Sequence, residues 1–238
     1  MPSRKRFLVS GGSGGIGAAV CHELATRGFC PIVGYRSNQF AAHDIAERND
    51  GIAQHLDLTS GTSIMDAVDH IEALTASDAN DGGALAGVIL CGSPPLALAP
   101  FGKITTEDLQ LQLQVNVIGP QLLLAELVRR CFRKNKEGIV VGVLTQAMGQ
   151  NKDATHHGHG VASGMGAYVI AKYGMAGLLE LLAADYPWLR VRSVKPGYTE
   201  TPMLQAFDER FLALQREKQE FLTPQQVASL IVEEALAP

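Results

Sequence analysis

The stretch VSGGSGGIG, Val9 to Gly17, is the part of the chain that decides the fold. It follows RFLVS, an apolar run that predicts a buried strand, and it opens GIGAAVCHELATRG, whose apolar spacing predicts a helix ending at Gly28. Glycines between a strand and a helix permit a sharp turn, and the free N–H groups of the helix start can bind a pyrophosphate. A flexible turn is the alternative, but the flanking strand and helix favour a dinucleotide site. The residues expected to contact the dinucleotide here are Gly11, Ser13, Gly14, Gly15, Ile16 and Gly17.

The same alternation of short apolar runs and longer amphipathic segments continues along the chain, which predicts parallel strands joined by crossover helices. Further strands are expected at residues 29–35, 51–58, 84–92, 138–145 and 189–194. Helices are expected near 40–48, 62–76, 105–133, 165–185, 203–219 and 224–236, with Gly119 and Pro120 bending or splitting the third of them. The fold class is therefore α/β: residues 1–238 form a single doubly wound Rossmann-type domain with a mainly parallel six-stranded sheet.

Composition and charge exclude several classes of protein. The 238 residues are 46% hydrophobic and 18% charged, as in a soluble globular chain. The formal net charge of -4 gives no electrostatic footprint for nucleic acid, and no uncharged apolar run approaches the roughly 18 residues that span a membrane. The four cysteines form no CxxC pair and are expected to be reduced. With no export signal at its start, the chain is expected to be cytoplasmic and to bind neither nucleic acid nor membrane.

The end of the second predicted strand carries information about the cofactor. In dinucleotide-binding folds an acidic residue at this point accepts hydrogen bonds from the ribose of NAD. Here GYRSN places Tyr35 at the acidic position, and Arg36, Ser37 and Asn38 offer a planar cation with hydroxyl and amide donors to a phosphate. The sequence therefore predicts NADP(H) in preference to NAD(H). The alternative is that Arg36 is only a surface charge in a turn.

Tyr168 and Lys172, in YVIAK, are one helical turn apart and so face the same way. The tyrosine side chain has a pKa of about 10, but a neighbouring ammonium favours the phenolate and eases proton exchange near neutrality. The spacing alone is a weak signal, because any helix can carry such a pair by chance. It becomes a candidate catalytic pair in combination with the other motifs.

Taken in order, these motifs resemble those of the short-chain dehydrogenase/reductase family across most of the chain. The matches after the glycine turn are Asp57 and Leu58 in HLDLTS, Asn116 in QVNVIG, Tyr168 with Lys172, and KPGYTETPM from Lys195 to Met203. The resemblance implies that Tyr168 exchanges a proton with the substrate oxygen. It implies that Lys172 holds the nicotinamide ribose and lowers the tyrosine pKa, and that Asn116 positions a water for proton relay. It also implies cofactor contacts by Asp57, Leu58, Cys91, Gly92, Tyr168, Lys172, Pro196, Gly197, Thr199 and Thr201.

Three features depart from the family's pattern. ILCG, residues 89–92, replaces the family's NNAG, so that only Gly92 is kept. The family's catalytic serine falls on Thr145, which keeps a hydroxyl that could hold a substrate carbonyl, with Ser163 as the rival position. The sequence given stops after PQQVASLIVEEALAP, so we expect the usual C-terminal seventh strand to be missing.

The resemblance implies an NADPH-dependent oxidoreductase that interconverts a carbonyl and an alcohol, most similar to 3-oxoacyl-thioester and carbonyl reductases. Its substrate is then a small ketone or an acyl thioester, covered by a helical lid at about 202–220, and the enzyme is a homodimer held by helices at 121–128 and 176–186. The alternative is a catalytically impaired NADP(H)-binding regulator or scaffold, which the altered NNAG and serine positions would suit. Retention of Asn116, Tyr168 and Lys172 favours the enzyme.

The segment HHGHG, which starts at His156, lies in an insertion, because Thr145 and Tyr168 are 23 residues apart and the family usually has about a dozen. Adjacent histidines in a glycine-rich loop lack the spacing of a structural zinc site, and Asp153 is the one nearby acid, so no metal is expected. A solvated loop and a wall of the substrate pocket stay open as alternatives. The histidines concerned are His156, His157 and His159.

Overall fold

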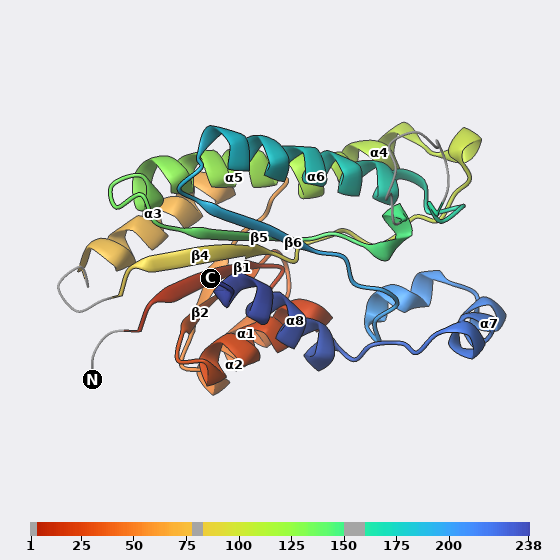
Figure 1. The fold of residues 1–238 in the computed structure, drawn as a ribbon, viewed down its shortest axis with the longest axis horizontal. Coiled ribbons are helices and arrows are strands. Elements are labelled where there is room, and N and C mark those ends of the chain that lie inside the picture. Colours follow the sequence, from red (N-terminus) through yellow and green to blue (C-terminus); the bar gives the residue numbers. More distant parts are fainter. Residues whose placement is uncertain (1–3, 78–82, 150–159) are drawn as a thin grey trace.

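Six parallel strands form the sheet of the computed structural model, which describes residues 4–77, 83–149 and 160–238 (Figure 1). The strands are β1 (Arg6–Ser10), β2 (Cys30–Tyr35), β3 (Ile52–His55), β4 (Leu85–Leu90), β5 (Ile139–Val143) and β6 (Arg190–Val194). Their order across the sheet is β3-β2-β1-β4-β5-β6, and every neighbouring pair is parallel. The order reverses between β1 and β4, which is where such sheets bind ligands. The expected six-stranded doubly wound sheet is confirmed, and within the described ranges β6 has no further strand beside it.

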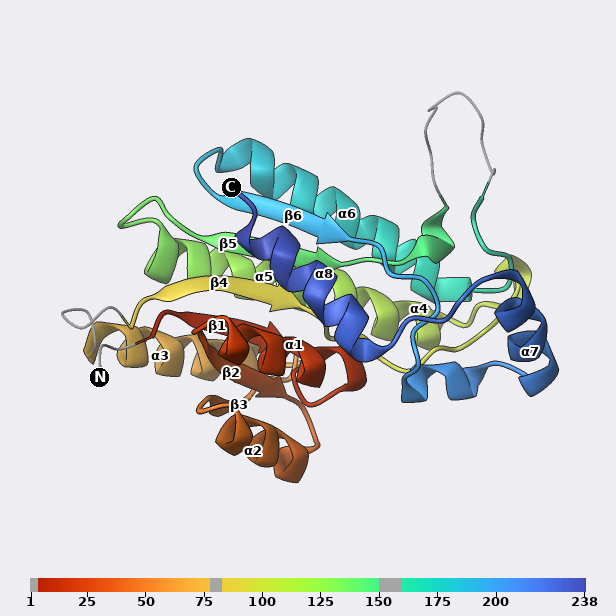
Figure 2. The ribbon, with the colours of Figure 1, turned by 60° about the horizontal axis from the view of Figure 1, so that its bottom comes forward.

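Helices cover both faces of this sheet (Figures 1 and 2). The helices on one face are α1 (Gly15–Thr26), α2 (Gln39–Arg48) and α8 (Pro224–Leu236); those on the other are α3 (Gly61–Ser77), α4 (Thr106–Leu113), α5 (Gly119–Leu127) and α6 (Gly166–Asp185). Strands covered on both faces need apolar side chains on both sides. Phe7 and Val9 accordingly join the core that includes α1 and α8, whereas Leu8 between them joins the core that includes α3 and α5. This explains why RFLVS has no polar alternation.

The helix expected at 105–133 is a continuous helical run with two wider turns. The first wide turn, Gln114–Ile118, joins α4 to α5, and the N–H of Gly119 donates to the carbonyl of Gln114, five residues back. Pro120 has no N–H and would crowd the carbonyl of a regular turn, so a π-type turn before it keeps the helix going. The predicted disturbance at Gly119 and Pro120 is thus a widened turn. Asn116 lies inside that turn.

The C-terminal part of the chain lies beside the carboxyl ends of the strands before it returns to the sheet. A 3-10 turn, η5 (Pro202–Ala206), and the helix α7 (Glu209–Lys218) stand apart from the two helical layers in both views. The chain then enters α8, where Thr223 and Gln226 form a capping box. The segment that carries η5 and α7 is therefore placed next to the expected ligand site.

Two helical segments are long and apolar enough to cross a membrane by length and mean hydropathy. They are Thr106–Phe132, with a mean hydropathy of 1.2, and Gly166–Asp185, with a mean hydropathy of 1.3. In the fold both lie on the same face of the sheet, and their side chains Leu124 and Leu179 belong to the core. Core helices need this composition, so it carries no argument for a membrane span.

Candidate active site

Three turns meet at the carboxyl ends of β1, β4 and β6. Gly11 has a φ of +65°, and a Cβ added there would lie 2.7 Å from Cα of Gly92, so the glycine turn and the turn after β4 are in close contact. A Cβ on Gly15 would lie 2.8 Å from Cγ2 of Thr201, so the turn after β6 touches the start of α1. The sequence-predicted cofactor segments around 11–17, 91–92 and 196–201 thus form one surface.

The start of α1 fits an anion. Gly14 is its N-cap with no side-chain hydrogen bond, the first turn holds no acidic residue, and both Gly14 and Gly15 are exposed. The first N–H groups of a helix have no partner within the helix, and its dipole is positive there. Ser13 and Ile16 are partly buried on the same turn, and Ile16 lines the main cavity. These donors fit the diphosphate of a dinucleotide.

The turn after β2 carries an uncommitted cation. Arg36 and Ser37 are exposed, and within the described ranges the Arg36 guanidinium makes no ion pair. Asn38 is partly committed, because its Oδ1 accepts a hydrogen bond from Ala41 N at 3.3 Å and caps α2. Tyr35, at the acidic position of NAD-binding folds, packs its ring 5.5 Å from that of His55. The Arg36 guanidinium and the Asn38 amide N–H groups are thus left as donors at this turn.

The adenine-side positions, Asp57 and Leu58, follow β3. Oδ1 of Asp57 accepts hydrogen bonds from N and Oγ1 of Thr59 at 2.9 and 2.8 Å, so this carboxylate shapes its own turn. Leu58 is buried, and a Cβ on Gly119 would lie 2.2 Å from its carbonyl oxygen, which places the turn firmly on α5. The predicted residues lie at the sheet edge where an adenine would bind.

A chain of hydrogen bonds that could not be predicted from the sequence joins the turn at Arg36 to the turn at Asp57. Nε2 of His55 lies 3.1 Å from the Arg36 carbonyl, its Nδ1 lies 3.2 Å from Ser63 Oγ, and Ser63 Oγ accepts from Asp57 N at 3.0 Å. A carbonyl only accepts, so Nε2 carries the proton of this contact. His55 precedes Asp57 by two residues, but no sequence signal indicates that its two nitrogens bridge separate loops.

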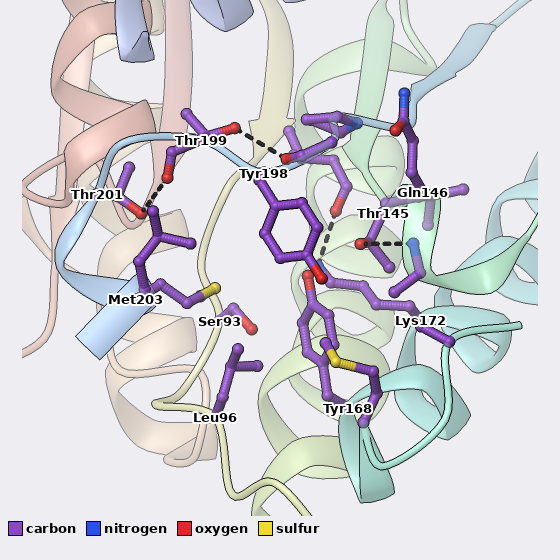
Figure 3. Close-up of a pocket in the computed structure, with 18 of the residues that line it drawn as sticks. Ser93, Leu96, Thr145, Gln146, Tyr168, Lys172, Tyr198, Thr199, Thr201 and Met203 are labelled. Atoms are coloured by element: carbon purple, nitrogen blue, oxygen red, sulfur yellow. Dashed lines mark hydrogen bonds between the residues drawn. The ribbon is translucent and has the colours of Figure 1, made fainter. Parts of the chain in front are cut away.

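The main cavity, with a volume of about 330 Å³, opens at the same ends of the strands (Figure 3). The predicted site residues that line it are Ile16, Cys91, Thr145, Tyr168, Lys172, Pro196, Gly197, Thr199 and Thr201. Other lining residues that the site prediction did not include are Ser93, Gln146, Tyr198, Met203, Gln215 and Gln219. Leu96, after β4, and Phe207, in the segment expected to cover the substrate, line it as well.

Tyr168 and Lys172 lie on α6 and are 8% and 2% exposed. Nζ of Lys172 donates to the Val143 carbonyl at 2.7 Å and lies 5.6 Å from the centroid of the Tyr168 ring. Burial raises the pKa of Tyr168, while a hydrogen-bonding interaction with Thr145 has the opposite, smaller effect. Burial also lowers the pKa of Lys172 to about 8. The pKa of Tyr168 is therefore raised, opposite to the expected lowering, and burial is the main cause.

Thr145 follows β5 and has an available hydroxyl proton. Its Oγ1 accepts from Ala147 N at 3.2 Å, so the O–H acts as a donor, and it interacts with the Tyr168 hydroxyl on the cavity lining. Ser163, the rival position, is exposed and does not line the cavity. Geometry favours Thr145 as the hydroxyl beside Tyr168.

Asn116 is fully buried behind this cavity and does not line it. Its Nδ2 donates to the carbonyl and to Oε1 of Gln112, both at 3.0 Å, and Gln112 Nε2 donates to the Pro95 carbonyl at 3.1 Å. Oδ1 of Asn116 has no hydrogen-bond partner among the described residues. A buried amide oxygen without a partner is suited to hold a water.

Ser10 links two of the turns at the ends of the strands. It is 1% exposed, and its Oγ accepts a hydrogen bond from Gly92 N at 3.3 Å, which joins the turns after β1 and β4. Like Gln112, it was not identified from the sequence, because a serine at the end of a buried strand looks the same whether or not it bonds across the sheet.

The inserted segment with His156, His157, His159 and Asp153 lies outside the described residues. Elsewhere, within 4–77, 83–149 and 160–238, no cluster of three or more potential metal ligands occurs. The cavity is bordered by Ala147 and Ala162, which are near the two ends of that segment in sequence.

Comparison with known proteins identifies relatives over most of the chain. A family model described as short chain dehydrogenase matches residues 5–211. The chain is 30% identical over 211 residues to the oxidoreductase YmfI of Bacillus subtilis, covering 85% of this chain and 78% of YmfI. It is 27% identical over 205 residues to 2,5-dichloro-2,5-cyclohexadiene-1,4-diol dehydrogenase of Sphingobium indicum, covering 85% and 76%. It is 26% identical over 237 residues to the 3-oxoacyl-(acyl-carrier-protein) reductase MabA of Mycobacterium tuberculosis, covering 95% and 83%.

Solved structures share the fold. A 3-ketoacyl-(acyl-carrier-protein) reductase from Brucella melitensis, complexed with NADH, superposes with a TM-score of 0.82 at 18% identity, over 100% of this chain and 93% of that one. A short chain dehydrogenase from Burkholderia cenocepacia, in complex with NADP, gives 0.79 at 24% identity, over 98% and 90%. At these identities the likeness concerns the fold alone.

Proposed function

The chain belongs to the short chain dehydrogenase family, and on that premise we propose that it reduces a carbonyl compound to an alcohol with NADPH. Family membership makes it an oxidoreductase with a nicotinamide cofactor. The observation that carries the proposal is that Thr145, Tyr168 and Lys172 line one cavity together with the turn at 196–201. Two hydroxyls and an amine are then available beside the surface that fits the dinucleotide.

Bound NADPH supplies a hydride to the carbonyl carbon. In the proposed reaction the Tyr168 hydroxyl gives its proton to the carbonyl oxygen, and the Thr145 hydroxyl donates a hydrogen bond to the same oxygen. Protonated Lys172 holds the nicotinamide ribose and stabilises the phenolate that Tyr168 becomes. The unpartnered Oδ1 of Asn116 holds a water that returns a proton toward Tyr168. Burial of Tyr168 favours the neutral phenol before the reaction, so the proton to be given is present.

We propose NADP(H) over NAD(H) as the cofactor. Support comes from the exposed Arg36 and Ser37, from Tyr35 at the position where an acid would bind a ribose, and from the His55 bridge that holds this turn. The comparisons include neighbours with each cofactor, NADH in one and NADP in another. Reduction with NADPH also suits the expected cytoplasmic location, which stays a prediction.

The proposed substrate is a ketone or a 3-oxoacyl compound. Two relatives carry names that describe such chemistry, a cyclohexadiene-diol dehydrogenase and a 3-oxoacyl reductase. Residues 202–220 are proposed as the lid of a single domain, and Met203, Leu204, Phe207, Gln215 and Gln219 from this segment line the cavity. Phe207 of this segment lines the cavity, whereas Phe211 and Leu212 do not.

We further propose a homodimer, with part of the expected segment 176–186 in its interface and with the leucines of 121–128 in the core of each chain. On the segment 121–128, Leu123, Leu124 and Leu127 are buried in the core of the single chain. Exposed apolar side chains on this side of the sheet include Leu111 at 39%, Ile118 at 52%, Ile170 at 38%, Tyr173 at 43% and Leu181 at 63%. Leu181 is the one of these that falls within 176–186.

The experiment that tests the proposed function is NADPH consumption by the purified protein against a panel of cyclic ketones, methyl ketones and 3-oxoacyl thioesters. We expect turnover of some members and tighter binding of NADPH than of NADH. Binding of NADPH without turnover of any carbonyl would support the alternative, a dinucleotide-binding regulator or scaffold.

A further inference from the structure

Tyr198 is a second tyrosine in the cavity, and the proposed reaction gives it no role. It follows Gly197 in the turn after β6, and Figure 3 shows its ring extending into the cavity that Tyr168 also lines. The side chain therefore belongs to the wall that a substrate meets, between the cofactor turn and the lid.

The ring of Tyr198 is held in place by aromatic packing. It stacks on Phe221, with centroids 4.9 Å apart and planes 14° apart, and it meets the edges or faces of Phe207 at 5.8 Å and Phe211 at 6.3 Å. The guanidinium of Arg216 lies 4.6 Å from the Phe221 ring centroid and pairs with Glu200 at 2.9 Å. Aromatic pairs of this kind add rigidity to packing, so the ring is positioned before a substrate arrives.

The backbone of Tyr198 is fixed as well. Its carbonyl accepts from Leu222 N at 2.9 Å, and the Leu222 carbonyl accepts from Glu200 N at 2.9 Å, so the turn pairs with the segment that leads into α8. A side chain anchored by its ring and by its backbone has one direction left for its polar end. That direction is into the cavity (Figure 3).

The Tyr198 hydroxyl has no hydrogen-bond partner in the described part of the chain, in contrast to the hydroxyl of Tyr173, which donates to the Met148 carbonyl at 2.6 Å. Burial raises the pKa of Tyr198, so the hydroxyl keeps its proton and can donate. Ser93 Oγ, also on the cavity lining, is buried without a partner. The hydroxyl of the half-buried Tyr198 and the buried hydroxyl of Ser93 are thus both available to bond a ligand that fills the cavity.

The charged side chains on the cavity lining indicate whether the substrate is charged or neutral. The described residues that line the cavity include no carboxylate and no guanidinium, and the one ammonium, Lys172, already donates to the Val143 carbonyl. A buried charged group needs a counter-charge, so a substrate amine or carboxylate would lack its partner here. A neutral oxygen needs only a hydroxyl donor.

We propose that Tyr198 is a specificity-determining residue that binds a second, uncharged oxygen of the substrate, such as a hydroxyl, ketone or thioester carbonyl, while Thr145 and Tyr168 hold the reacting oxygen. This proposal rests on the proposed reductase function and names its substrate class: neutral ketones that carry another oxygen near the reacting carbon. The hydroxyl gives selectivity because a substrate without that oxygen leaves it unpaired.

The test compares three proteins: the wild type, Tyr198→Phe and the control Tyr186→Phe, whose residue lies at the far end of α6. Each is assayed with two matched pairs of ketones, one member of each pair carrying the second oxygen. The pairs are cyclohexanone with 2-hydroxycyclohexanone, and methyl butyl ketone with ethyl acetoacetate. Tyr198→Phe keeps the aromatic packing and removes only the hydroxyl. We expect kcat/KM for the oxygen-bearing members to fall about tenfold in Tyr198→Phe, with the simple ketones within about twofold of wild type. Tyr186→Phe should match wild type on all four.

Equal losses on both kinds of substrate would overturn the proposal, because they would assign Tyr198 to the reacting oxygen or to the fold. No loss on either kind would overturn it as well. If the wild-type protein reduced no carbonyl compound, the proposed function would fail, and this inference with it. A normal wild-type rate without the selective loss would contradict the role of Tyr198 alone.

Discussion

Nζ of Lys172 donates a hydrogen bond of 2.7 Å to the carbonyl of Val143, and this contact anchors the lysine across the end of β5. The side chain is 2% exposed, and burial lowers its pKa to about 8. An amine that is buried and held in this way can lose its charge at mildly alkaline pH, which ordinary lysines do not. The charge of Lys172 should therefore affect how the free energy of unfolding depends on pH.

We expect the free energy of unfolding of the wild-type protein to rise between pH 8 and 10.5, relative to that of Lys172→Met. In this window the folded protein has lost the proton and the unfolded chain still binds it, so stability increases by about 1.4 kcal/mol per pH unit. Below the folded pKa both states are protonated, and the difference should be constant. Denaturant unfolding of both proteins across this range measures it. Parallel profiles would show that the pKa of Lys172 is not lowered.

Arg36 is expected to select the cofactor. Arg36→Ala should raise the Kd of NADPH about tenfold or more at low salt and leave that of NADH nearly unchanged, because a charge-assisted hydrogen bond is lost from one ligand only. Arg48→Ala is the matched control, since Arg48 lies at the other end of α2 and pairs with Asp44 at 2.8 Å. Fluorescence titration of both cofactors gives the result. Equal weakening of NADH and NADPH by the Arg36 change would contradict a phosphate contact.

Gly15 is expected to be required for cofactor binding rather than for folding. In Gly15→Ala the new Cβ would lie 2.8 Å from Thr201 Cγ2, so the turn after β6 must shift away from the start of α1. We expect about a tenfold loss of cofactor affinity, since the diphosphate donors and the nicotinamide turn are no longer in register. Gly102→Ala, at an exposed position with open space at its Cβ, should keep the affinity for the cofactor. A cofactor affinity unchanged in Gly15→Ala would show that the three turns move independently.

The proposed dimer is tested at its exposed apolar residues. Leu181→Glu should shift the protein from dimer to monomer in light scattering at micromolar concentration, because a carboxylate cannot be buried there without a partner. Leu230→Glu is the control, since Leu230 is 47% exposed on the opposite face of the sheet. A wild-type protein that scatters as a monomer would refute the dimer.

The strands and the side-by-side placement of Tyr168 and Lys172 could be predicted from the sequence because their signals are local. RFLVS needs only its own apolar run, and Tyr168 and Lys172 need only their helical spacing. The glycine motif then fixes where β1 ends and where the cofactor turn begins. Each of these signals is contained in a few consecutive residues, so apolar periodicity and residue spacing are enough to predict it.

The contacts that tune the site could not be predicted, because they join residues far apart in the chain. Ser10 reaches Gly92, His55 reaches Arg36, and Tyr198 is packed by phenylalanines from the lid and from the segment before α8. The raised pKa of Tyr168 was missed for a related reason. Spacing shows that Lys172 faces the same way, but only the fold shows how deeply both are buried.

Proton transfer by Tyr168 is the central claim, and its most direct test is single-turnover oxidation of NADPH by Tyr168→Phe with the best carbonyl substrate of the wild-type protein. The variant lacks only the hydroxyl, so the predicted result is NADPH binding within about twofold of wild type and a rate of hydride transfer lower by about 100-fold or more. Tyr186→Phe should behave as wild type. A Tyr168→Phe protein that binds NADPH and oxidises it at the wild-type rate would contradict the account.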